Sequence, residues 1–273
     1  MLCAFRGWND AGEAASSAVS FLAGALGAKR FARLDGEDFY DFQANRPTIR
    51  LGDDDRREID WPTVEIFEAR APRAHRDLVL VQGVEPSMRW RSFSAGIVDL
   101  AEALGVQLVV SLGSLLGDVP HTRPVAMTGH ASDAALLERL GLPSTRYEGP
   151  TGIVGALHAT CAQAGLPAAS VWAAVPHYVA SANNPKAALA LLRKVEGLIG
   201  ISVDVSELES ATADYERQVG LAVQSDADIQ AFVERLEQAA DSEESDGEDH
   251  VTSGDVLARE FQRFLRQRGP ESR

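Results

Sequence analysis

Polar side chains that could take part in acid–base chemistry follow several apolar runs of the chain. Asn9 and Asp10 follow the first run by a few residues, and Glu85 stands just before Pro86 after another run. A carboxylate at such a position could act as a general base, bind a cation, or accept a hydrogen bond from a nearby arginine or tryptophan. The alternative is that Glu85 only ties down its own loop.

A second polar segment is the tripeptide His121, Thr122 and Arg123, which lies between two prolines. The prolines fix the loop, so its side chains are held at low entropic cost. His121 could titrate near neutral pH, and the planar guanidinium of Arg123 suits a carboxylate or a phosphate. Arg123 would then clamp an anionic ligand. Alternatively it pairs with Glu85 or Asp118 and pins adjacent loops.

Two further segments complete the set of candidate residues. Tyr147 and Glu148 precede a predicted helix that Thr151 would cap, and free N–H groups at a helix start favour an anion. The spacing matches no glycine-rich phosphate motif, and a helix whose glycines allow close packing is the alternative. His177 follows the last apolar run and could form a proton-handling pair with His121.

The elements that would position these groups alternate between strand and helix. Apolar runs typical of buried strands occupy residues 2–5, 78–81, 108–112, 125–128 and 171–175. Helical spacing occupies residues 12–26, 94–104 and 151–164, with Ser94 and Thr151 as expected N-caps. The alternation predicts an α/β fold whose parallel sheet has helices on both faces. Parallel strands would bring Asp10, Glu85, His121 and His177 to one rim.

The rest of the chain differs in pattern. Residues 34–70 are charged and turn-rich, and we expect a hairpin or edge strands lying over the main sheet. From residue 204 the pattern is helical, with helices expected at 205–223 and 226–240 and an amphipathic helix at 255–267 that must dock on its own body, a sister subunit or another protein. The expected organisation is an α/β core at 1–203, a helical extension at 204–240, an acidic linker at 241–250 and a C-terminal amphipathic helix at 251–273.

Composition excludes several classes of protein. The chain has 273 residues, 45% of them hydrophobic, and a formal net charge of −14, which disfavours nucleic acid and anionic lipid as partners. No apolar stretch approaches the length of a membrane span, and the two cysteines predict no disulfide framework, so we expect a cytoplasmic protein. The sequence lacks the motifs of zinc sites and of a serine nucleophile elbow. We therefore expect no metal or other cofactor, and we assign no catalytic residue.

Several segments, in order, resemble the PAC2 family, which is named after a proteasome assembly chaperone, and in particular its actinobacterial branch. They are GWNDAG at 7–12, GVEPSMRW at 83–90, PHTRP at 120–124, YEGPTG at 147–152, WAAVPHY at 172–178 and NPKA at 184–187. The resemblance implies a three-layer α/β/α core similar to purine nucleoside phosphorylases, with a helical C-terminal extension. It also implies self-association, for which we expect a trimer, and, for eukaryotic and archaeal relatives, assembly of proteasome core particles.

Two departures from the family pattern concern the ends of the chain. Archaeal relatives that dock on proteasomes resemble one another in ending with a hydrophobic residue, a tyrosine and one further residue, whereas this chain ends in GPESR. That docking mode is therefore not expected. Relatives also begin with a longer stretch before the GWNDAG segment, and a misplaced start codon is one explanation.

Three hypotheses for function follow. The chain is a self-associating scaffold or assembly-chaperone-like protein, with proteasome subunits as possible partners. Alternatively, it binds a nucleoside-like or carboxylate ligand, or acts on it as a hydrolase or phosphorylase, with Asp10 or Glu85 as the base and Arg123 as the anion clamp. In the third hypothesis the polar rim is structural and is covered by subunit contacts. The second hypothesis requires the candidate side chains to surround one concave pocket.

Overall fold

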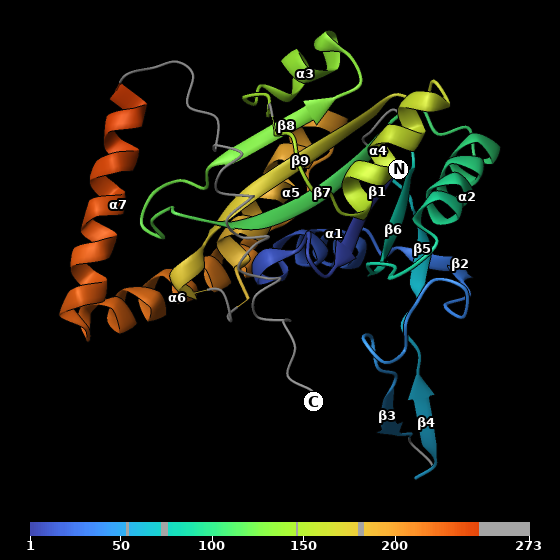
Figure 1. The fold of residues 1–273 in the computed structure, drawn as a ribbon, viewed down its shortest axis with the longest axis horizontal. Helices are drawn as coiled ribbons and strands as arrows, with labels where there is room; N and C mark the ends of the chain where they lie inside the picture. The colour runs from blue at the N-terminus through green and yellow to red at the C-terminus, as the bar shows by residue number, and fades with distance from the viewer. Residues whose placement is uncertain (53–54, 72–75, 146, 180–182, 246–273) are drawn as a thin grey trace.

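The computed structural model describes residues 1–52, 55–71, 76–145, 147–179 and 183–245, and within them the core is a seven-stranded sheet (Figure 1). The strands, in the order β2-β5-β6-β1-β7-β9-β8 across the sheet, are Lys29–Leu34, Val64–Ala69, Leu78–Val84, Leu2–Arg6, Val109–Gly117, Ala168–Pro176 and Met127–Ala131. Strands β6, β1, β7 and β9 are parallel. Strands β5, β2 and β8 pair antiparallel with their neighbours. The four strands that precede Asn9, Glu85, His121 and His177 therefore run the same way, as predicted.

Helices cover both faces of this sheet. Successive residues of β1 point to opposite faces, so Leu2 and Ala4 pack into one core and Cys3 and Phe5 into the other. The first core is closed by α1 (Ala14–Ala25) and α5 (Pro185–Ile199), and the second by α2 (Trp90–Ala103) and α4 (Ile153–Gln163). The predicted α/β fold with helices on both faces of the sheet is confirmed. The sheet is mixed instead of wholly parallel, because β8, which holds part of the predicted strand at 125–128, pairs antiparallel with β9.

Several element boundaries differ from the predictions. Helix α2 begins at Trp90 after Arg89, which has a left-handed backbone, so the expected cap Ser94 lies inside the helix and is buried. The N-cap of helix α4 is Gly152, so Thr151 is not the N-cap. Strand β8 begins at Met127 rather than at residue 125. Strand β2 and helices α3 (Ala134–Leu140) and α5 were not predicted from the sequence.

A two-stranded ribbon leaves the main sheet. Strands β3 (Thr48–Leu51) and β4 (Arg57–Asp60) pair antiparallel, and every residue in them is exposed. The predicted hairpin is confirmed, but it projects away from the main sheet instead of lying over it (Figure 1). The ribbon is tethered through β5, which runs between β2 and β6.

The helical extension consists of α6 (Ser206–Gln224), which packs on α5, and α7 (Ala227–Ser245), which packs on α6. Both predicted helices are confirmed, but α7 continues through residues 241–245, which were expected to belong to the acidic linker. The expected helix at 255–267 lies outside the described residues. None of the described helices is long and apolar enough to cross a membrane.

Candidate functional site

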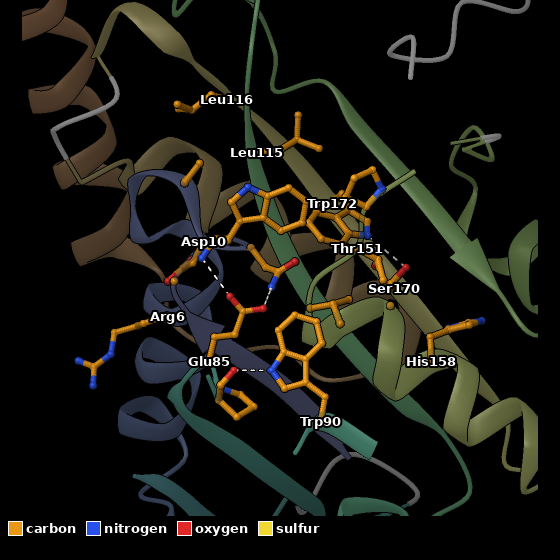
Figure 2. Close-up of a pocket in the computed structure, with 18 of the residues that line it drawn as sticks. Arg6, Asp10, Glu85, Trp90, Leu115, Leu116, Thr151, His158, Ser170 and Trp172 are labelled. Carbon is orange, nitrogen blue, oxygen red and sulfur yellow. Dashed lines mark hydrogen bonds between the residues drawn. The ribbon is translucent and has the colours of Figure 1, made fainter. Parts of the chain in front are cut away.

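A cavity of about 1210 Å³ lies where β1, β6, β7 and β9 end (Figure 2). Its walls come from the loops after β1 and β6, from the start of α4 and from β7, β8 and β9. Six of the residues singled out from the sequence line it, namely Asn9, Asp10, Glu85, Tyr147, Thr151 and His177.

Glu85 joins three separate segments at this cavity. Its Oε1 accepts hydrogen bonds from Asn9 Nδ2 at 2.6 Å and from the backbone N–H of Ile153 at 2.9 Å, and its Oε2 accepts one from the backbone N–H of Trp8 at 3.3 Å. Burial raises the pKa of Glu85, and these three hydrogen bonds oppose that rise. Glu85 does more than fix its own loop. It also places a carboxylate at the N-terminus of α4, where an anionic ligand would otherwise bind.

Two glycines allow this close arrangement. Gly7 has a φ of 143°, and a Cβ there would lie 3.0 Å from Cβ of Glu85. A Cβ at Gly152 would lie 2.3 Å from Asn9 Nδ2, so only glycine lets the amide sit against the start of α4.

Asp10 has one engaged and one unengaged oxygen. Its Oδ1 accepts hydrogen bonds from the backbone N–H groups of Ala15 at 2.8 Å and Ser16 at 3.1 Å, and so caps the start of α1. Its Oδ2 is buried and has no hydrogen-bond partner among the described residues, and the same holds for Asn9 Oδ1. Burial raises the pKa of Asp10, and the bonds from Ser16 and Ala15 oppose that rise.

Aromatic side chains that sequence reasoning did not single out form much of the remaining wall. They are Trp8, Trp90, Trp172, His130 and His158. Trp90 Nε1 donates to the carbonyl oxygen of Pro86 at 2.5 Å, and Trp172 Nε1 donates to Ser170 Oγ at 3.2 Å. Burial, and next the neighbouring His130, lower the pKa of His158 to about 4, so its ring is neutral near pH 7.

The tripeptide 121–123 does not reach the cavity. Arg123 Nε and Nη2 donate to the two oxygens of Asp241 on α7 at 2.6 Å and 2.8 Å. Thr122 Oγ1 donates to Glu237 on the same helix. The predicted role of Arg123 as an anion clamp at the cavity is therefore wrong, and so is its predicted pairing with Glu85 or Asp118.

His121 and His177 both contact Tyr178. The ring centroid of Tyr178 lies 5.9 Å from that of each histidine, and its hydroxyl lies 2.8 Å from His121 Nδ1. His177 Nδ1 lies 3.0 Å from Asp118 Oδ1. Among the described residues no contact joins the two histidines directly, so the expected proton-handling pair does not form. Glu148 is exposed and is not part of the cavity lining.

Among the described residues the lining groups no metal-binding set, and two serines at or beside it are already hydrogen-bonded. Within the described ranges, no three His, Cys, Asp or Glu side chains are grouped so that they could hold a metal ion. Ser170 accepts from the Trp172 indole, and Ser114 Oγ donates to the carbonyl oxygen of Ala11 at 2.8 Å. The site therefore consists of buried acceptors and aromatic surfaces.

Comparison with known proteins identifies the family of the chain. A family model described as PAC2 family matches residues 4–223. This chain belongs to the PAC2 family. A PAC2 family protein from Streptomyces avermitilis is 50% identical over 85% of this chain and 98% of that one, with a TM-score of 0.79. A proteasome-assembly chaperone homologue from Mycobacterium tuberculosis is 46% identical over the same shares of the two chains, with a TM-score of 0.78.

The fold extends to more distant structures. An archaeal proteasome activator from Pyrococcus furiosus is 17% identical, with a TM-score of 0.65, over 81% of this chain and 92% of that one. At that identity the likeness concerns the fold alone. None of the curated proteins compared with the chain matches it.

Proposed function

We propose that this PAC2 family chain is a self-associating, assembly-chaperone-like protein that acts by binding other protein chains. The observation that carries the proposal is the uncovered apolar face of the β3–β4 ribbon. A two-stranded ribbon alone is marginally stable in water, and an exposed apolar face is typical of a protein–protein contact.

The ribbon has two chemically distinct faces. Ile49 lies opposite Ile59 in the register, and the period of two along each strand puts Leu51 and its partner Arg57 on the same face. Trp61 follows β4 and packs against Phe42, with the ring centroids 4.9 Å apart. The side chains of Ile49, Leu51, Ile59 and Trp61 are between 49% and 68% exposed. On the other face Arg50 bonds to Glu58 at 2.6 Å and to Asp60 at 2.8 Å. One face is thus internally satisfied and the other is not.

A second copy of the chain is the proposed occupant of the apolar face. Each copy carries the same face, so symmetric association buries it on every copy at once, and we propose a trimer. Proteasome subunits are the proposed further partners. The Mycobacterium tuberculosis relative, described as a proteasome-assembly chaperone homologue, supports that part of the proposal. The buried free thiols Cys3 and Cys161 support a cytoplasmic location.

The oligomeric state tests self-association. We expect light scattering after size exclusion to give a multiple of the 29.3 kDa chain mass. The double variant Ile49→Glu/Ile59→Glu should dissociate to monomer, because it places charge on the apolar face. Thr48→Glu adds charge to the opposite face and should leave the mass unchanged. A wild-type monomer, or a double variant with the wild-type mass, would contradict self-association through the ribbon. Co-purification of proteasome subunits with the native protein tests the assembly role.

A second candidate function is small-molecule binding at the strand-end cavity. The observation that favours it is the convergence of six expected residues on one cavity of about 1210 Å³, which is large enough for a small ligand. We propose binding of a small molecule at this cavity.

A further inference from the structure

The charges around the cavity are predominantly negative. Among the lining residues are the carboxylates of Asp10, Glu13, Asp41 and Glu85, while Arg6 is their one arginine or lysine within the described residues. A cleft lined mainly by one sign of charge concentrates ligands of the opposite sign. This feature favours a cation over a phosphate or a carboxylate.

Two buried oxygens in the same wall lack hydrogen-bond donors. Asn9 is 1% exposed and Asp10 is 6% exposed, and neither Asn9 Oδ1 nor Asp10 Oδ2 accepts a hydrogen bond from the described residues. Buried acceptors without partners are costly and uncommon in native proteins. Asn9 Oδ1 can only accept, and so can Asp10 Oδ2 while its carboxylate is ionised, so the group that would satisfy them is a donor. An N–H group of a ligand fits that requirement.

Two of the cavity tryptophans could contact a ligand through the faces of their rings, because their indole N–H groups are already hydrogen-bonded. The indole N–H groups of Trp90 and Trp172 donate to protein oxygens. Figure 2 shows these two rings in the same lining as Asp10 and Glu85. The face of an indole ring attracts ammonium groups strongly when both are shielded from water.

Two groups that could bind an anion are already engaged by carboxylates of the protein, and Arg6 remains as the basic side chain of the described lining. Glu85 accepts from the backbone N–H of Ile153 at the start of α4, and Arg123 binds Asp241 on α7. The cavity therefore favours a positively charged ligand over the nucleoside-like or carboxylate ligand expected from the sequence.

We propose that the cavity binds a small organic cation whose ammonium N–H groups donate to Asp10 Oδ2 and Asn9 Oδ1 and whose body lies against the tryptophan faces. This proposal rests on the second candidate function and names its ligand class. It is independent of self-association through the ribbon, because the four apolar ribbon residues lie outside the cavity lining.

Three probes of similar size separate charge from shape, namely phenethylamine, 2-phenylethanol and phenylacetate. The chain has four tryptophans, of which Trp61 lies by the ribbon and the other three line the cavity. In a Trp61→Phe background, therefore, every remaining indole reports on the cavity. We expect fluorescence titration and calorimetry of the full chain to show phenethylamine binding at least about tenfold more tightly than either other probe, as one charge-assisted hydrogen bond would give.

Two variants locate the bound ammonium group. Asp10→Asn keeps an oxygen to cap α1 but removes the charge, and it should weaken phenethylamine about tenfold while leaving 2-phenylethanol unchanged. Glu148→Gln changes an exposed carboxylate outside the lining and should leave both affinities unchanged. Because the probe comparison uses chains with Asp10 intact, it holds even where Asp10→Asn folds poorly.

Each other outcome overturns a defined part of the proposal. Tighter binding of phenylacetate or 2-phenylethanol would establish a ligand site but refute the cation. If phenethylamine bound equally well to the Asp10→Asn variant and to the chain that keeps Asp10, the placement of the ammonium group against Asp10 would be refuted. Absence of binding by all three probes at millimolar concentration would refute both the cation and the small-molecule function.

Discussion

The loop after β1 and the loop after β7 follow parallel neighbouring strands, yet they serve different parts of the molecule. Asn9 and Asp10 contribute buried atoms to the cavity wall. Thr122 and Arg123 bind side chains of α7. The carboxyl ends of parallel strands lie at the same edge of the sheet. How far a loop lies beyond that edge depends on the length of the strand that precedes it.

The register explains the separation. Asp10 forms a bridge with Ser114, and β7 then continues to Gly117, which pairs with Pro176 of β9. Three further residues of strand carry the chain about 10 Å beyond the level of Asp10. The tripeptide 121–123 begins only after that extension, where α7 is available as a partner. The first loop is therefore expected to be rigid and coupled to the core, and the second to be held by surface pairs.

Glu85→Ala should have the largest effect, because three donors lose their shared acceptor. We expect the free energy of unfolding to fall by about 3 kcal/mol in denaturant titrations, since unsatisfied buried donors are costly. The exposed Glu148→Ala in the neighbouring loop is the matched control and should change stability by less than about 0.5 kcal/mol. Equal effects of the two substitutions would show that the first loop is not coupled to the core.

Acid should lower the free energy of unfolding through His158, which lines the cavity. The pKa of this histidine is about 4 in the folded chain, below the ordinary value near 6.5. The unfolded chain therefore takes up a proton first as the pH falls, and the stabilising contribution present above about 6.5 is lost toward pH 4. Because the ring is only partly buried and solvent screens it, the loss stays below the roughly 3 kcal/mol that the full difference in pKa would give.

Denaturant titrations at pH 7 and pH 4.5 measure this effect. The variant His158→Phe should lose less stability between the two pH values than the wild type does. Burial, and next Lys186, lower the pKa of His121 in the second loop, so its contribution has the same sign. A wild type and a His158→Phe variant with the same pH dependence would contradict the assigned pKa.

Gly7→Ala tests whether the first loop requires its backbone geometry. The positive φ of Gly7 and the 3.0 Å approach to Cβ of Glu85 predict a loss of about 2 kcal/mol. Gly24→Ala is the matched control, because it lies in α1 with nothing within 4 Å of the added Cβ. It should be neutral or stabilising by up to about 1 kcal/mol. A tolerated Gly7→Ala would mean that the loop adapts.

The sequence predicts the sheet and part of the site for a physical reason. Alternating apolar runs identify buried strands, and parallel strands bring Asn9, Asp10 and Glu85 together at one edge. The apolar runs, however, do not show that β7 extends to Gly117. They therefore place the tripeptide 121–123 beside Asp10, whereas it lies further along the strand direction.

Long-range packing explains the remaining misses. Trp172 lies inside an apolar run and looks like core, but it reaches the cavity from β9. His158 lies on α4 and is set in place by tertiary packing. The partners of Arg123 come from more than one hundred residues further along the chain, a separation that local patterns do not record.

Arg123→Ala should have the smallest effect on global stability and the most local one. Its side chain and that of Asp241 are partly exposed, and such pairs contribute about 1 kcal/mol or less. We expect hydrogen exchange to become faster in α7 while β7 and β9 stay protected, because α7 loses a two-point contact to the loop. Asp214→Ala removes an exposed pair with Arg217 within α6 and should leave exchange in α7 unchanged. Faster exchange in the strands themselves would mean that the second loop is as tightly coupled to the core as the first.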